Sequence, residues 1–200
     1  LVRVLHMLGR LFGRRKFRYR CAECGKWHSG SPSFSYKYPV HYFDVPEDER
    51  DRRVQVTDDL CQIEPAPDDG EGAMIHCIRV ILEIPIIGLD EPFTWGVWVT
   101  QSQESFDRYF KTYDQDQSGE QSFGWLAVNM PFYNNTGPDE YLVNLECDVN
   151  WGPPGQRPTA HLWECDHPLA IDQQNGISWD KAAEIANLAN REFHGRDEPG

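Results

Sequence analysis

The sequence predicts an α+β fold: an antiparallel sheet with helices on one face, preceded by an N-terminal CxxCG segment that resembles a zinc knuckle. Two neighbouring segments alternate apolar residues as strands do, and two others show helical spacing. Strands follow strands without regular helical crossovers, which favours α+β over α/β. The 200 residues, 40% of them hydrophobic, suffice for one domain with a substantial core.

We expect three parts: a basic N-terminal extension over 1–18, a single domain over 19–195 and a disordered tail over 196–200. The first 20 residues hold seven basic residues and no acid, although the whole chain carries a net charge of −13. The apolar residues of the extension fit one stripe of a helix, which predicts either a surface helix that touches a membrane or partner, or a poorly ordered appendage. No export signal or membrane-spanning run is recognisable, so we expect a cytoplasmic protein.

The first elements of the domain are predicted to be short. Residues 19–42 are rich in Gly, Ser, Pro and Tyr, which indicates a knuckle followed by loops. Residues 46–53 predict a charged helix, because Glu49 and Arg53 stand four residues apart in the favourable order. A short strand is expected to begin at Leu60.

The strongest strand signals lie at 73–88 and 93–101, where β-branched and aromatic residues alternate. We expect these strands to form an antiparallel hairpin. A helix over 102–114 follows, with Ser102 as its N-cap and aromatic residues at helical spacing. Residues 123–140 are aromatic and rich in turn formers.

The last elements are a second hairpin and a helix. Residues 140–149 and 159–165 predict paired strands, joined by a connection rich in Pro and Gly. Residues 178–193 predict a helix that Ser178 caps and that presents an alanine-lined face.

The stretch RCAECGKWHSG carries the most specific chemical signal. Cys21 and Cys24 are separated by two residues and followed at once by a glycine, a spacing that turns both sulfurs inward, as a tetrahedral zinc site requires. His28 supplies a third ligand. The fourth is expected to be Cys61, which follows the charged helix and a turn.

Cys165 and His167 are alternatives to Cys61 as the fourth ligand. Three other interpretations of the cysteine pair stay open: a redox dithiol, a local disulfide, and thiols without a role. The remaining cysteines are scattered, which favours reduced thiols over a disulfide framework.

Two further places offer chemistry. Asp166 next to His167 could orient a general base, although neighbouring strand residues point in opposite directions. Trp95, Trp98 and Trp125 belong to an aromatic strip that lines either a ligand groove or the core.

The negative charge constrains the partners. An acidic surface repels nucleic acid phosphates and anionic membranes, so we expect no nucleic acid partner. The same surface attracts a basic protein partner.

The chain resembles the bacterial family of unknown function DUF2199 from Tyr19 to about Ala189. The resemblance rests on five blocks taken together: CAECGKWH (21–28), PEDERDRRVQVTDDLC (46–61), LEIPIIGLDEPFTWGVWVTQS (82–102), FGWLAVNMPFY (123–133) and DHPLAIDQQNGIS (166–178). It implies that the four expected ligands and His167 lie within family motifs, whereas the basic extension does not. It implies no activity, because the family has none established.

The sequence therefore predicts an acidic, cytoplasmic, non-enzymatic domain that holds one structural zinc and binds another protein, with an immunity or antitoxin-like role as one form of this. The alternatives are a metal-dependent hydrolase with an open zinc site, with His167 or Asp166 as base, and a small-ligand module built on the tryptophans. A closed four-ligand site favours the structural role, and an open site beside a cleft favours the enzyme.

Overall fold

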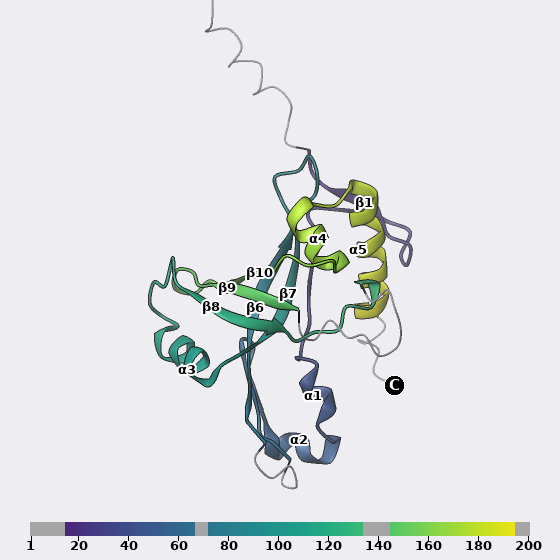
Figure 1. Ribbon diagram of the computed structural model, residues 1–200. Coiled ribbons are helices and arrows are strands. Elements are labelled where there is room, and N and C mark those ends of the chain that lie inside the picture. The colour runs from purple at the N-terminus through teal and green to yellow at the C-terminus, as the bar shows by residue number, and fades with distance from the viewer. Residues whose placement is uncertain (1–14, 67–71, 134–144, 195–200) are drawn as a thin grey trace, which may run out of the picture.

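A long hairpin forms the centre of the fold, as the sequence predicts. The computed structural model describes residues 15–66, 72–133 and 145–194 (Figure 1). Strands β6 (Ile75–Ile84) and β7 (Phe93–Gln101) pair in antiparallel register from His76 opposite Gln101 to Ile84 opposite Phe93. β-branched and aromatic residues fill both strands because both faces of this hairpin are largely covered.

The hairpin closes into a five-stranded barrel. The ring consists of β7, β8 (Gln121–Leu126), β9 (Glu146–Asn150), β10 (Thr159–Leu162) and β6. Strand β8 pairs with the last part of β7, and β10 pairs with the later part of β6, so the two lie at diagonally opposite ends of the hairpin. Because β9 pairs with both, these three strands cross the hairpin and curl the sheet shut (Figure 1).

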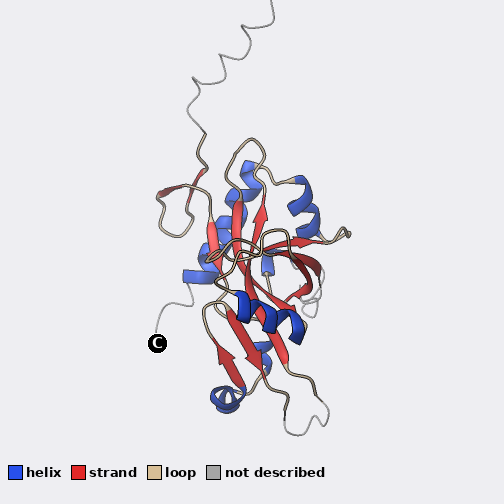
Figure 2. Cartoon of the chain, turned by 90° about the vertical axis from the view of Figure 1, so that its left-hand side faces the viewer, coloured by secondary structure: helices blue, strands red, loops and turns tan. Residues whose placement is uncertain are grey.

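Three short strands extend the barrel at its free edges. Strand β3 (Ser33–Ser35) lies parallel to the first part of β7, and β5 (Leu60–Ile63) lies antiparallel to the first part of β6. Strand β4 (Val54–Val56) pairs with β5. Separately, β1 (Arg18–Arg20) and β2 (Trp27–Ser29) form a two-stranded ribbon that stands apart from the main sheet (Figure 2).

The helices do not share one face, which corrects the predicted layout. Helix α3 (Gln103–Thr112) packs beside the start of β6, where the Phe106 ring lies 4.9 Å from that of His76. Helices α4 (Pro168–Asn175) and α5 (Trp179–His194) lie at the other end of the hairpin, and α1 (His41–Asp44) and α2 (Glu47–Arg53) lie at a third place (Figure 1). A ring has several outer sides to cover, whereas an open sheet has two.

The sheet is also not wholly antiparallel, because β10–β6 and β3–β7 are parallel pairs. The segment 123–140, predicted as aromatic and turn-rich, overlaps the second half of β8, and Gly124 lies inside that strand. A Cβ at Gly124 would stand 2.6 Å from the Thr100 carbonyl oxygen, so the glycine permits close approach of β8 to β7. A 3-10 turn, η1 (Pro131–Tyr133), follows.

Several local predictions are confirmed by the caps and pairs. Arg53 contacts Glu49 at 2.7 Å in α2, and the Ser105 amide donates to Ser102 Oγ at the start of α3. The Lys181 amide donates to Ser178 Oγ at the start of α5. Strands β9 and β10 pair as expected, although residues 140–144 of the predicted strand lie outside the described residues.

Residues 1–14 of the predicted extension and the predicted tail over 196–200 lie outside the described residues. Of the expected extension, Phe17 is buried and its ring lies 5.0 Å from that of Trp179, and Arg18 begins β1. No helix in the described part of the chain is both long and apolar enough to cross a membrane.

Candidate metal centre

The β1–β2 ribbon shapes the CxxCG segment into a tight turn. Tyr19 stands opposite His28 in the ribbon, and the Cys21 amide donates to the Lys26 carbonyl at 2.9 Å. The Gly25 amide donates back to the Cys21 carbonyl at 3.0 Å. Gly25 has a φ of +68°, which explains why a glycine follows the second cysteine.

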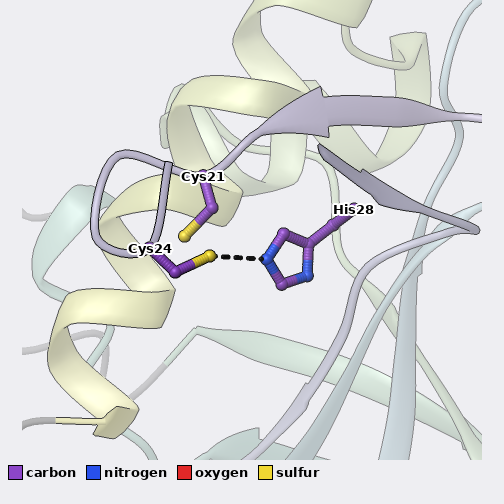
Figure 3. A group of neighbouring side chains, drawn as sticks. All are labelled: Cys21, Cys24 and His28. Atoms are coloured by element: carbon purple, nitrogen blue, oxygen red, sulfur yellow. Dashed lines mark hydrogen bonds between the residues drawn. The ribbon is translucent and has the colours of Figure 1, made fainter. Parts of the chain in front are cut away.

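The turn brings together the side chains of Cys21, Cys24 and His28 (Figure 3). Their ligand atoms all lie within 4.8 Å of one another, and Cys24 Sγ lies 3.3 Å from His28 Nε2. A tetrahedral zinc with bonds of about 2.3 Å to sulfur and about 2.0 Å to nitrogen separates such atoms by roughly 3.5 Å. The arrangement therefore fits a zinc ion with little movement.

Helix α5 holds the ribbon through two asparagines. Asn187 Oδ1 accepts a hydrogen bond from the Ala22 amide at 2.8 Å, and its Nδ2 donates to the Arg20 carbonyl at 3.3 Å. Asn190 Nδ2 donates to the Tyr19 hydroxyl at 2.6 Å. The end of β1 and the start of the turn are thus fixed by side chains at least 165 residues further along the chain.

The environment of Cys21 favours its thiolate. A backbone hydrogen bond from Cys24 lowers the pKa of the Cys21 thiol, against the opposing effect of burial. Asn190 Nδ2 also lies 4.0 Å from Cys21 Sγ. A thiolate is the form that binds metal. Tyr19 stacks on His28 with ring centroids 5.4 Å apart, which fixes the imidazole beside the sulfurs.

The structure does not bring Cys61 to this group. Cys61 lies in β5 opposite Cys77 of β6 and is fully buried. Burial raises the pKa of the Cys61 thiol to about 12, so this thiol stays protonated. The set of four predicted ligands is therefore reduced to a group of three among the described residues.

The alternative ligands and the candidate base also lie elsewhere. Cys165 and Asp166 are exposed in the segment before α4. His167 is the N-cap of α4, where its Nδ1 accepts a hydrogen bond from the Leu169 amide at 3.1 Å. His167 therefore caps the helix. Pro168 favours the first position of a helix, so its presence directly after His167 could have indicated this role in the sequence.

The tryptophans of the predicted groove are divided between core and surface. Trp95 and Trp98 are fully buried, so they line no groove. Trp98 Nε1 donates to the Tyr36 carbonyl at 3.0 Å, and the Arg79 guanidinium lies 4.7 Å from its ring centroid. Trp125 is 41% exposed on β8.

Sequence reasoning missed the asparagines of α5. Asn190 is buried among the alanines of the face that the helical pattern predicts. A buried amide requires a partner, so an asparagine on an apolar helix face is the signal that could have indicated docking at this position.

All six cysteines are free thiols, so the local disulfide is not formed.

The family model described as "Uncharacterized protein conserved in bacteria (DUF2199)" matches residues 20–177, and the chain belongs to this family. The matched region includes the three-residue group and ends before α5. No match was found among curated proteins or among solved structures.

Proposed function

We propose that this DUF2199 member binds one zinc ion through Cys21, Cys24 and His28 and acts as a non-catalytic module that binds a basic protein. The observation that carries the proposal is the convergence of two thiols and one imidazole on a turn whose backbone amides favour thiolate. Sulfur and imidazole ligands together select zinc among the abundant divalent ions.

The ion would serve to order the ribbon. Residues 22–29 are all exposed, so the turn buries little apolar surface of its own. The hydrophobic effect therefore stabilises this segment little. The free energy of metal binding would instead stabilise its folded conformation. The zinc would fix the turn in the conformation in which the ribbon forms hydrogen bonds with Asn187 and Asn190 of α5.

Three described ligands leave the fourth position to water or to a donor from outside the group, and this favours a second candidate function, a metal-dependent hydrolase. Neither proposed base belongs to the group, and His167 Nδ1 accepts a hydrogen bond from the Leu169 amide at the start of α4. The structural role therefore has the better support. An immunity or antitoxin-like role is one form of it that the acidic charge fits.

Zinc analysis of matched cysteine variants tests this proposal. We expect about one zinc per chain in the wild type and in Cys61→Ser, and none in Cys24→Ser, because Cys24 belongs to the three-residue group and Cys61 does not. Both changes replace sulfur with oxygen, so each variant controls for the other. Zinc retained in Cys24→Ser, or lost in Cys61→Ser while the barrel stays folded, would contradict the proposal.

The same samples separate the two candidate functions. Ester or phosphoester hydrolysis in the wild type that disappears in a folded Cys24→Ser variant would favour the hydrolase. Loss of order in the ribbon without any hydrolysis in either protein would favour the structural role.

A further inference from the structure

The outer face of strands β8, β9 and β10 carries a row of aromatic and acidic side chains. In each strand, every second residue is buried inside the barrel, as Gly124, Cys147 and Ala160 illustrate. The residues between them therefore point outward. On this outer face lie Phe123, Trp125, Glu146, Asp148 and His161, with Trp163 directly after β10.

The aromatic members form one contiguous cluster. The Phe123 ring lies 4.5 Å from the Trp125 ring and 5.1 Å from the Trp163 ring, centroid to centroid. Trp125 is 41% exposed and Trp163 is 45% exposed. Two half-exposed indoles joined by a phenyl ring form an apolar surface of the kind that marks an interaction site.

The strands of this cluster and the connection that follows them carry carboxylates and no lysine or arginine. Residues 121–126, 146–150 and 159–167 contain four acids and no lysine or arginine. Glu146 stands opposite Trp125 in the β8–β9 register, and Trp163 Nε1 donates to Asp148 Oδ1 at 3.0 Å. Glu164 and Asp166 follow on the exposed connection to α4.

The cluster continues into a cleft of about 300 Å³ beside β7. Trp125 is one wall of the cleft, and Met74, 41% exposed, is another. The cleft gives a side chain that stacks on Trp125 a place to enter.

We infer that this outer face binds an arginine-rich segment of a partner protein. A guanidinium stacks on indole rings through cation–π attraction and pairs with carboxylates in the same plane, so it satisfies both kinds of group on the face. The four carboxylates would repel the phosphates of a nucleic acid, and a neutral sugar would leave the negative charge of the carboxylates without a counter-charge. The inference rests on the interaction role in the proposed function and gives that role a location; it is independent of the zinc.

Calorimetric titration with a short peptide of alternating arginine and alanine tests the inference. We expect the full chain to bind this peptide and not one of alternating glutamate and alanine. The double variant Trp125→Ala/Trp163→Ala should bind at least about tenfold more weakly, because it removes both stacking surfaces. Trp27→Ala is the matched control, since Trp27 is 66% exposed on the ribbon beside Arg18, and it should bind like the wild type.

A second variant keeps the test decisive if the double variant folds poorly. Glu146→Gln/Glu164→Gln changes only exposed charges, and we expect it to weaken binding and to reduce its salt dependence. Unchanged affinity in these variants, equal binding of the acidic peptide, or preferential binding of an oligosaccharide would overturn the inference.

Zinc content measured on the same samples distinguishes the two proposals. A wild type that holds zinc but binds no arginine peptide overturns the location and leaves the metal centre intact. A wild type that binds the peptide through Trp125 and Trp163 but holds no zinc overturns the metal centre and leaves the location of the binding face intact.

Discussion

The ribbon and the barrel use cysteine in opposite ways. In the ribbon, Cys24 is exposed and a backbone hydrogen bond lowers the pKa of Cys21. In the barrel, Cys61, Cys77 and Cys147 are fully buried, and burial raises the pKa of each thiol. The barrel thiols are small apolar side chains, whereas the ribbon thiols belong to a group that could hold a metal ion. The environment, and not the residue type, decides which cysteine does chemistry.

The two regions also differ in what stabilises them. The barrel buries large apolar side chains, which supply most of the folding free energy. The ribbon has an exposed turn and is held to α5 by hydrogen bonds of Asn187 and Asn190. Changes in the barrel should therefore affect global unfolding, and changes at the ribbon should affect local opening and metal binding.

The largest expected effect is in the barrel. Trp95 is fully buried and stacks on Phe93, Phe34 and Phe132. Trp95→Ala should lower the free energy of unfolding by about 3–5 kcal/mol, because it leaves a cavity in the core. Urea unfolding followed by circular dichroism measures this. A loss below about 1 kcal/mol would show that the barrel core is not the main source of stability.

At the ribbon, Asn190→Ala should have an intermediate and local effect. The change removes the hydrogen bond to the Tyr19 hydroxyl and the amide beside Cys21. We expect local stability at residues 18–29 to fall by about 1–3 kcal/mol and zinc affinity to fall about tenfold. Hydrogen exchange and chelator competition measure the two effects. Asn175→Ala, at the exposed end of α4, is the control and should change neither.

Acidification should weaken the barrel through His76. Burial lowers the pKa of His76 below that of the unfolded chain, with Asp107 partly opposing this shift. The unfolded state then binds more protons below about pH 6.5, so this contribution to stability is complete above that pH and is lost as pH falls. Urea midpoints near neutral pH and near pH 5.5 measure the loss, which should be smaller in His76→Gln. An identical pH dependence in the variant would contradict the prediction.

The smallest expected effect is that of Trp27→Ala. Trp27 is 66% exposed, and its described contact is with the Arg18 guanidinium at 5.3 Å from the ring centroid. The free energy of unfolding should change by no more than about 0.5 kcal/mol, as for most surface substitutions. A clearly larger loss in thermal or urea unfolding would show that the ribbon face contributes to the fold.

Local sequence patterns were sufficient to predict the strands and helices that have a strong periodicity. The range 93–101 coincides with β7, and the helices expected around Ser102 and Ser178 are present with those residues as caps. Such patterns are readable because cap, spacing and burial all act within a few residues. The three-residue group was predictable for the same reason, since Cys21, Cys24 and His28 lie within one turn.

Pairings between distant residues were not predictable from these patterns. The sequence pattern did not predict strand β8. Gly124 permits the close approach of two strands, but in the sequence it cannot be distinguished from a glycine in a turn. The parallel pairing of Ala160 with Leu82 closes the ring across 78 residues and leaves no local signal. Cys61 does not join the group because the pairing of β5 with β6 places it opposite Cys77, where it is fully buried.

The sequence by itself determined the family, through five blocks in a fixed order. It also determined the hairpin, the helices capped by Ser102 and Ser178 and the knuckle, because each of these follows from residues that are near neighbours along the chain. Only the tertiary structure decided that the sheet closes into a barrel, that α5 holds the ribbon, and that Cys61 belongs to the core. The physical reason is that burial and strand pairing are set by contacts between residues far apart in sequence, and one periodic pattern is compatible with several such contacts.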